Sequence, residues 1–262
     1  MISYADYKLG AKDPVHDKYG LHLSTIAPGI LSRQPQNSSM RFTEINPENW
    51  ILGDNDKIGD CTCVSGANSM LFRSTLRDEN VLRVPTPRII NFYEIFGYNP
   101  QLTQPDGSNP TDQGAVLTNV MQTWMTRGYD TGSGINRLSG YGSIDPRNTN
   151  LIKNAIDLFE DVYTGVQLTV AQQTQEIWDY VPNSPIWGGH CIDIVGYDEE
   201  YFYGISWKKV FRITVRFILM QCMEMYALLD KVSFLSLDKA GVTGINYSAL
   251  ENVVRQLGGP IN

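Results

Sequence analysis

Residues 188–198 read GGHCIDIVGYD, and this stretch does more than any other to decide the fold. Its β-branched and aromatic residues, bounded by glycine and aspartate, are typical of a buried β-strand. His190 follows Gly188 and Gly189 and opens the strand, so the sheet holds the imidazole at an accessible edge. A histidine buried only for packing more often lies inside an apolar run. The stretch therefore predicts a strand that presents His190 for acid–base chemistry.

The second informative stretch is residues 51–76. Residues 51–60, ILGDNDKIGD, are a polar loop, and small or apolar residues then recur at helical spacing. The residues at this spacing are Cys61, Val64, Ala67 and Leu71. The pattern predicts a buried helix that begins at Cys61, with Asp60 at the N-cap position.

Cys61 is a candidate nucleophile because of this placement. The first turn of a helix stabilises a thiolate through the helix dipole and its unpaired backbone N–H groups. Gly59, two positions earlier, leaves room for a substrate backbone to come close. The alternative is that Cys61 is a small buried hydrophobe, as many helix cysteines are. A base such as His190 is needed to activate the thiol and to protonate a leaving amine.

The rest of the chain predicts an irregular beginning, a helical front and a strand-rich back. Residues 1–50, punctuated by glycine and proline, are expected to form an extended arm over the core. A helical lobe of residues 51–160 is expected to hold helices at 61–76, 88–96, 114–127 and 148–159. A β-rich lobe of residues 161–262 is expected to hold strands at 162–170, 191–197, 201–206 and 225–229, and helices at 215–223 and 248–257. The predicted fold class is α+β with two lobes.

Composition and charge exclude several classes of protein. The chain has 262 residues and a net charge of −7, with 21 Lys and Arg against 28 Asp and Glu, which disfavours a nucleic-acid-binding protein. No apolar run approaches the roughly 20 residues that cross a bilayer. Residues 1–6 lack the layout of a signal peptide. The four cysteines show no disulfide-framework spacing, so reduced thiols are expected.

Arrangements that could bind a metal or a cofactor are weaker. Cys61, Cys63, His190 and Cys191 are zinc-ligand types, but a Cys-x-Cys pair on a helix projects its thiols about 200° apart. Residues 190 and 191 also face opposite sides of a strand. The glycine-rich stretch 132–142 lacks the lysine and the strand–loop–helix frame of a phosphate loop, and is expected to be a surface loop. We therefore predict no metal and no cofactor.

Together, the Gly59-Asp60-Cys61 segment and the stretch 188–198 resemble the papain-like cysteine peptidase family, in the compact form found in bacteriophages and bacteria. The 129 positions between Cys61 and His190 (190 minus 61) are close to the roughly 130 of that family. The resemblance spans about residues 48–230 and includes 112–117, 127–129 and 165–168. It implies a papain-like two-lobed fold, with the cysteine on a helix of one lobe and the histidine on an antiparallel sheet of the other.

The resemblance also implies roles for individual residues. Cys61 is expected to be the nucleophile and His190 the general base and acid, with the backbone N–H of Cys61 in the oxyanion hole. The family carries a glutamine six residues before the cysteine. This chain has Asn55 there, which offers the same donor group on a shorter stem.

The asparagine that orients the histidine in the family is missing. The family has an Asn-Ser-Trp-Gly run, and residues 205–208 of this chain read ISWK, with Ile205 in place of the asparagine. Trp207 is expected to shield the Cys–His pair. Ser206 or Asp193 could take the orienting role, although alternation along the strand points Asp193 away from His190.

Two functions remain open. One is a thiol hydrolase that cleaves peptide or amide bonds of a peptide or protein substrate through an acyl-enzyme, impaired by the missing asparagine. The other is a structural protein of a bacteriophage virion, such as a capsid decoration or tail-associated protein, with a catalytically degenerate fold and other virion proteins as partners. The expected location is the host cytoplasm during assembly, or the virion. The arm of residues 1–50 is short for an inhibitory pro-segment.

Overall fold

The computed structural model describes residues 3–77 and 79–258, which are built around an eight-stranded sheet of order β1-β4-β10-β5-β7-β8-β9-β6. The β1–β4 and β6–β9 pairs are parallel, the other neighbours are antiparallel, and β2 and β3 form a separate pair. The strands are β1 (Leu21–His22), β2 (Tyr129–Asp130), β3 (Ile135–Asn136), β4 (Gly140–Ser143), β5 (Val162–Thr169), β6 (Ile177–Trp178), β7 (Ile186–Tyr197), β8 (Tyr201–Ser206), β9 (Lys209–Thr214) and β10 (Cys222–Leu229).

Helices lie on both faces of this sheet. The α-helices are α1 (Leu23–Ile26), α2 (Cys61–Leu76), α3 (Thr86–Glu94), α4 (Leu117–Thr126), α5 (Thr149–Phe159), α6 (Val215–Gln221), α7 (Lys231–Lys239) and α8 (Tyr247–Gln256). Short 3-10 turns are η1 (Pro28–Ser32), η2 (Arg41–Glu44), η3 (Pro47–Asn49), η4 (Pro100–Leu102) and η5 (Val170–Gln173). Within residues 3–77 and 79–258, every helix is too short or too polar to cross a membrane.

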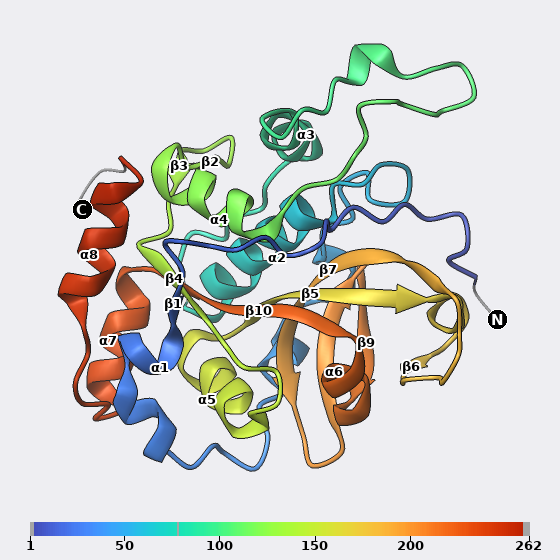
Figure 1. The fold of residues 1–262 in the computed structure, drawn as a ribbon. Coiled ribbons are helices and arrows are strands. Elements are labelled where there is room, and N and C mark those ends of the chain that lie inside the picture. Colours follow the sequence, from blue (N-terminus) through green and yellow to red (C-terminus); the bar gives the residue numbers. More distant parts are fainter. Residues whose placement is uncertain (1–2, 78, 259–262) are drawn as a thin grey trace.

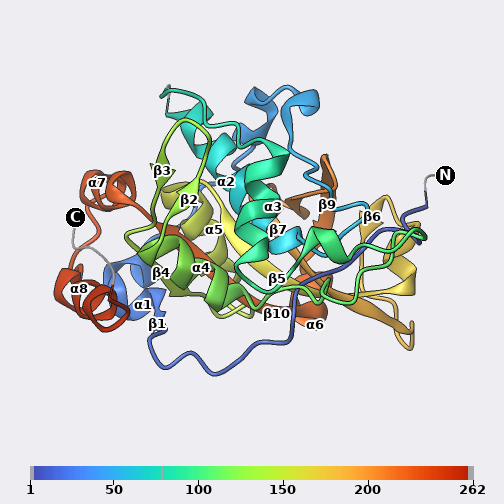
Figure 2. The same ribbon diagram turned by 90° about the horizontal axis from the view of Figure 1, so that it is seen from above.

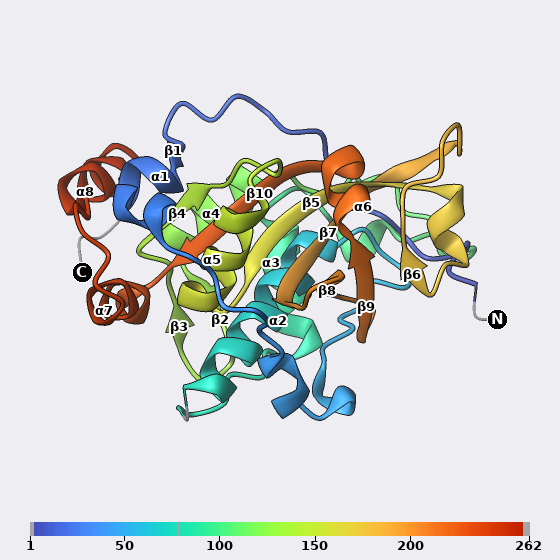
Figure 3. The ribbon, with the colours of Figure 1, turned by 90° about the horizontal axis from the view of Figure 1, so that it is seen from below.

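The sheet separates two hydrophobic clusters. The first cluster contains side chains of α2, α3 and α4, and the second contains side chains of α1, α5, α6, α7 and α8. In Figure 1, α2, α3 and α4 lie above the strands and α1, α5 and α6 lie below them, and Figure 3 shows the same ribbon from below. Alternation along β5 shows the division, because Tyr163 packs in the first cluster whereas Val162 and Val166 pack in the second. The predicted α+β fold class is confirmed.

The strands and helices expected from the sequence are present, and the structure also has elements that the sequence did not predict, such as β1, α1, β6 and β9. The C-terminal part has α7 as well as the expected terminal helix. The lobe boundary that the sequence predicts at residue 160 lies between α5 and β5, and α5 packs in the second cluster. The prediction that residues 132–142 form a surface loop is wrong, because this stretch contains β3 and the start of β4. A Cβ at Gly142 would lie 3.0 Å from the Cα of Leu23, so close packing of α1 explains the glycine.

Two arginines fix the C-terminal half of α2 onto the strands. Arg73 forms a buried ion pair with Asp161 and donates to the carbonyl of Leu228 at 3.0 Å. Arg77 donates to Glu160 and, at 2.7 Å, to the Asp230 carboxylate. Although burial opposes ionisation, the two arginines lower the pKa of Asp230 to about 2. This ion-pair network anchors the helix that begins at Cys61.

Candidate active site

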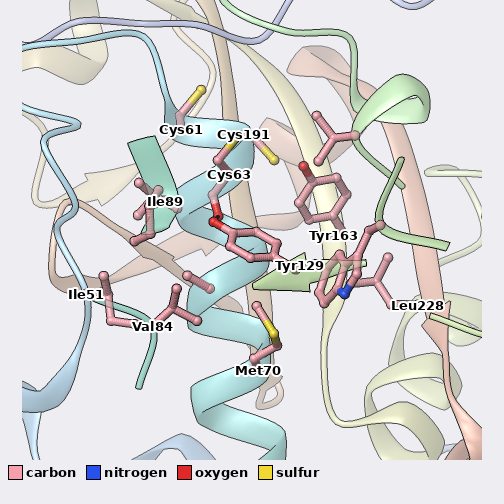
Figure 4. Close-up of a cluster of buried hydrophobic side chains, with 14 of the residues drawn as sticks. Ile51, Cys61, Cys63, Met70, Val84, Ile89, Tyr129, Tyr163, Cys191 and Leu228 are labelled. Atoms are coloured by element: carbon pink, nitrogen blue, oxygen red, sulfur yellow. Dashed lines mark hydrogen bonds between the residues drawn. The ribbon is translucent and has the colours of Figure 1, made fainter. Parts of the chain in front are cut away.

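Cys61 lies in the first turn of α2, with 1% of its surface exposed. Figure 4 shows its side chain at the N-terminal end of the helix. Burial raises the pKa of the thiol to about 12, and Asp60 adds to the rise, while the backbone N–H groups of Cys191 and Gly10 oppose it. The thiol is therefore neutral in this arrangement, despite its position at the positive end of the helix dipole.

Asp60 is the N-cap residue of α2, as expected, but its side chain does not cap the helix. Its backbone has φ −91° and ψ 14° instead of the extended conformation of a capping residue, and the carboxylate makes no cap hydrogen bond. Both carboxylate oxygens are buried and lack a hydrogen-bond partner among the described residues. Burial is the main reason that the pKa of Asp60 is raised, and the charges of Asp54 and Asp112 add to it.

His190 lies on β7, fully buried beneath an aromatic side chain. Its Nε2 lies 2.7 Å from Ser206 Oγ, and its ring stacks on Trp207 with centroids 4.6 Å apart. Nδ1 has no hydrogen-bond partner among the described residues. Burial lowers the pKa of His190 to about 3, so the ring is neutral. No hydrogen bond joins the ring to the Cys61 sulfur, although both residues lie in the described part of the chain.

A tight turn between β8 and β9 places the Trp207 ring against His190. Trp207 has φ +47° and Lys208 has φ +62°, so both central residues adopt the left-handed conformation that asparagine and glycine favour. Such strain persists only where surrounding packing enforces it. The stacking of Tyr4 and His190 on Trp207 is part of that packing.

The alternation of β8 explains how Ser206 reaches the ring although Ile205 occupies the expected asparagine position. Ile205 packs in the first cluster, so the next side chain faces the other side of the sheet and meets His190. Asp193 pairs with Ile205 across the ladder and is buried, and neither carboxylate oxygen has a partner among the described residues. Its pKa is raised by burial and then by Asp161, a residue of the α2 network.

Asn55, the expected oxyanion donor, is buried in the loop before α2, where its Nδ2 donates to the carbonyl of Ile58 at 3.2 Å. Residues that the sequence did not identify as functional connect this loop to the opposite loop. The N–H of Gly59 donates to both carboxylate oxygens of Asp112, at 2.9 and 3.1 Å. Asp112 also accepts from Tyr93 Oη, which in turn accepts from the N–H of Gly114.

The N-terminal arm passes between the two walls of the site. The N–H of Ala115 donates to the Gly10 carbonyl at 2.8 Å, and the N–H of Lys12 donates to the Ala115 carbonyl at 3.0 Å. From the other wall, the Gly189 carbonyl accepts from the N–H of Ala11 at 3.0 Å. In Figure 1 and Figure 2 the arm crosses the molecule from the end marked N to β1. An extended backbone segment of the arm therefore already lies between the residues of the two walls.

Glycines on both walls let this backbone come close. A Cβ at Gly189 would lie 2.1 Å from the Ala11 carbonyl oxygen, and a Cβ at Gly114 would lie 2.1 Å from the Gly10 carbonyl oxygen. On the arm itself, a Cβ at Gly10 would lie 1.8 Å from the Gly59 carbonyl oxygen. The sequence led us to expect that Gly59 admits a substrate backbone, and in this structure the backbone beside it is that of the arm.

Residues near the start of the arm cover the aromatic side of the site. Tyr4 stacks on Trp207 with centroids 5.0 Å apart, and Tyr7 meets the same ring edge-on. Lys209 donates to Tyr4 Oη at 2.8 Å, which fixes the tyrosine over the turn. The arm was expected to be too short for an inhibitory segment, but residues 4–12 are enough to lie across both Trp207 and Cys61.

No protein-family model matches the sequence, and a comparison with curated proteins gives no match. Similar solved structures include xylellain, a cysteine protease from Xylella fastidiosa, with a TM-score of 0.64 at 13% identity over 86% of this chain and 96% of that one. The fold is that of the papain-like cysteine proteases.

Precursor forms share this papain-like fold. Procathepsin B S9 from Trypanosoma congolense has a TM-score of 0.59 at 11% identity over 87% of this chain and 89% of that one. Digestive procathepsin L 3 from the larval midgut of Tenebrio molitor has a TM-score of 0.58 at 12% identity, over 87% and 77% of the two chains. The two-lobed fold expected from the motifs is confirmed.

Proposed function

We propose that this protein is a papain-like thiol peptidase and that its own N-terminal arm keeps it latent. The observation that carries the proposal is the peptide backbone of residues 10–12 in the cleft, bound by main-chain hydrogen bonds to Ala115 and Gly189. Main-chain bonds of this kind recognise a peptide whatever its side chains are. Cys61 on one wall and His190 on the other supply the chemistry of peptide-bond cleavage.

In the proposed reaction, His190 takes the proton of the Cys61 thiol, and the resulting thiolate attacks the peptide carbonyl carbon while the carbonyl π electrons move to oxygen. The backbone N–H of Cys61 and, after a loop shift that frees its amide, Asn55 donate to this oxyanion. When the C–N bond breaks, His190 gives its proton to the leaving amine. His190 then takes a proton from water as its oxygen attacks the thioester carbon, and the Cys61 sulfur leaves with the electron pair.

The supporting residues have corresponding roles in this proposal. Ser206 holds Nε2 of His190 and leaves Nδ1 available for the thiol, which is the orienting role that an asparagine would otherwise take. Trp207 covers the ring and excludes water. With the arm in place, the pKa of the thiol is about 12 and that of the imidazole about 3, so no ion pair forms. Removal of the arm would expose the Cys61 thiol to water and bring its pKa closer to that of the imidazole.

The arm can be displaced by a single substitution. In Gly10→Val the new side chain overlaps the Gly59 carbonyl, so the arm is expected to leave the cleft. We expect iodoacetamide to label Cys61 at least about 10-fold faster in Gly10→Val than in the unaltered chain, and a fluorogenic peptide panel to be cleaved. Ala5→Val, on an exposed arm residue, is the matched control. Cys61→Ala and His190→Ala in the Gly10→Val background are expected to abolish cleavage.

One observation favours the alternative function, a virion structural protein with a degenerate site. Cys61 and His190 are both neutral, and no hydrogen bond joins these two described residues. Under this alternative, Gly10→Val labels no faster than the unaltered chain and cleaves nothing. Mass spectrometry of purified virions would then find the protein in many copies, and its absence from particles would exclude the structural role.

A further inference from the structure

A chain of hydrogen bonds joins the loop before α2 to the loop before α4. The N–H of Gly59 donates to both carboxylate oxygens of Asp112, at 2.9 and 3.1 Å. Asp112 Oδ1 also accepts from Tyr93 Oη of α3 at 2.8 Å, and Tyr93 Oη accepts from the N–H of Gly114 at 2.7 Å. We name these four residues the Asp112 link.

The direction of each hydrogen bond in the Asp112 link is fixed by the groups themselves. Burial raises the pKa of Tyr93, and its hydrogen bond to Asp112 raises the pKa further, so the hydroxyl keeps its proton. Tyr93 gives this single proton to Asp112 and uses a lone pair to accept the N–H of Gly114. Every contact of the carboxylate in the link therefore comes from a donor, as an ionised group requires. Hydrogen bonds to an ionised acceptor are stronger than neutral ones.

The two loops that the link connects have different tasks in the proposed peptidase. Gly59 lies two residues before Cys61, whose backbone N–H is a proposed oxyanion donor. Gly114 directly precedes Ala115, whose N–H and carbonyl bind the backbone of the arm. The Asp112 link therefore ties the segment that carries the reacting group to the segment that holds a peptide.

Gly59 and Gly114 also enclose Gly10 of the arm. A Cβ at Gly10 would lie 1.8 Å from the Gly59 carbonyl oxygen, and a Cβ at Gly114 would lie 2.1 Å from the Gly10 carbonyl oxygen. Because both glycines contact Gly10, the separation of their loops determines whether a backbone segment fits between them. The Asp112 link bonds the N–H groups of these same two glycines, so it holds that separation.

Asp112 is itself fixed by its own loop. Its N–H donates to the Asn109 carbonyl at 3.1 Å. Asn109 Nδ2 donates to the Asn99 carbonyl at 2.8 Å, and the N–H of Asn99 donates to Thr111 Oγ1 at 2.9 Å. These bonds close the base of the long loop between α3 and α4, and Asp112 directly follows that base. The carboxylate is thus held in place from its own side before it contacts Gly59.

We propose that Asp112 is a positioning residue with two effects. With the arm in place, the link keeps Gly10 bound and Cys61 covered. With the arm displaced, the link holds the N–H of Cys61 and the backbone of Ala115 at the spacing that a peptide substrate needs, and a small misplacement of such groups is costly. The second effect rests on the proposed peptidase function, whereas the first does not.

The first effect is tested in the chain with an unaltered arm. In Asp112→Asn, the amide NH2 faces the N–H of Gly59 in either orientation, because that N–H bonds both oxygens. We expect iodoacetamide to label Cys61 at least about 5-fold faster in Asp112→Asn, as the loss of one hydrogen bond would allow. The matched control is Asp106→Asn, on an exposed residue of the same loop whose carboxylate bonds Ser108. Equal labelling of Asp112→Asn and the unaltered chain would overturn the first effect.

The second effect has the opposite sign and is tested in the Gly10→Val background. We expect Asp112→Asn to lower kcat/KM for a fluorogenic peptide at least about 10-fold. The rate of Cys61 alkylation, which follows the thiolate fraction and needs neither loop, is expected to change less than about 2-fold. Faster alkylation in this background too would mean that the substitution unfolds the site, and would overturn the positioning role.

Tyr93→Phe separates the two ends of the link. It removes the acceptor for the N–H of Gly114 and leaves the bond between Gly59 and Asp112 in place. In Gly10→Val we expect it to raise KM at least about 3-fold and to change kcat less, because peptide binding loses more than the reacting group does. Tyr98→Phe is the control, since Tyr98 stacks on Tyr93 with centroids 5.0 Å apart and its hydroxyl lies outside the link. Equal effects of the two substitutions would contradict the link.

The outcomes distinguish this proposal from the proposed function. If Gly10→Val cleaves nothing, the peptidase function and the second effect fail together, while faster labelling of Asp112→Asn with the unaltered arm still supports the first effect. If Gly10→Val cleaves peptides and Asp112→Asn changes neither labelling nor kcat/KM, the Asp112 proposal fails and the peptidase function stands. Faster labelling with an unchanged kcat/KM would overturn the second effect alone.

Discussion

The two ends of α2 differ in how completely their charged and polar groups are paired. At the C-terminal end, Arg73 and Arg77 meet Asp161, Glu160 and Asp230 in a network of ion pairs. At the N-terminal end, the carboxylate of Asp60 and one ring nitrogen of His190 are buried without a partner among the described residues. The arginines that fix the helix are paired with carboxylates, of which only Asp161 Oδ2 lacks a hydrogen-bond partner among the described residues, whereas Asp60 and His190 Nδ1 lie unpaired near the segment that the arm occupies.

The largest effect is expected from a substitution that removes an ion pair at the C-terminal end of α2. Arg73→Met leaves the carboxylate of Asp161 buried without its counterion, and we expect the free energy of unfolding to fall by about 3–5 kcal/mol. Urea denaturation measures this loss. The matched control is Arg88→Met, which removes an exposed ion pair with Asp130 and is expected to cost less than about 1 kcal/mol. Equal losses in the two variants would mean that the buried network does not anchor α2.

His190, whose Nδ1 is unpaired near the N-terminal end of α2, is expected to make the chain less stable in weakly acidic solution. The pKa of His190 is about 3 in the fold against an ordinary value near 6.5, so the unfolded chain binds a proton first as the pH falls. The His190 contribution to stability is full above about pH 7 and is lost as the pH falls toward 3. The loss of unfolding free energy between pH 7 and pH 5 amounts to about 2 kcal/mol.

His190→Gln isolates this contribution from groups that titrate in the opposite direction, such as Glu224, whose pKa burial raises to about 7. The difference in unfolding free energy between the unaltered chain and His190→Gln is expected to shrink as the pH falls from 7 to 5. A difference independent of pH would contradict a buried, neutral imidazole. The ion pairs at the C-terminal end of α2 affect stability only at lower pH. The pKa of Asp230 is about 2, so its contribution to stability is lost only below about pH 3.8.

The smallest expected effect concerns the strained turn over His190. Lys208 has φ +62°, which glycine adopts without strain, so Lys208→Gly is expected to stabilise the chain by about 0.5–1 kcal/mol. Thermal unfolding measures the gain. Arg212→Gly, in the extended strand β9, is the control and is expected to be destabilising instead. A loss of stability in Lys208→Gly would show that the turn is not strained.

Much of the fold could be predicted because local patterns and the tertiary structure agree. The β-branched stretch around His190 is a strand, and the small residues after Asp60 form a buried helix. The strand at Gly140 and Gly142 could not be predicted, because those glycines are explained by helices that pack on them from distant parts of the chain. Propensity alone indicates a loop there, and tertiary packing overrides it.

The candidate site was predictable in its residue types and less so in its surroundings. Cys61 stood out because it begins a helix, and His190 because two glycines precede it in a β-branched stretch, although β7 itself begins at Ile186. The contact of Ser206 with His190 depends on which face of β8 each side chain takes, which a one-residue change of register reverses. The place of Gly10 beside Ala115 depends on a contact between residues 105 positions apart (115 minus 10), and no local pattern marks it.

The pH dependence of Cys61 alkylation in Gly10→Val tests the central claim most directly. The rate follows the thiolate fraction, so its midpoint reports the pKa of the thiol, which is about 12 with the arm in place. We expect the midpoint to fall below about 8.5, the ordinary value for a cysteine, once the arm has left and His190 can pair with the thiol. A midpoint that stays near 12 in Gly10→Val, as in the unaltered chain, would contradict a latent peptidase held closed by its arm.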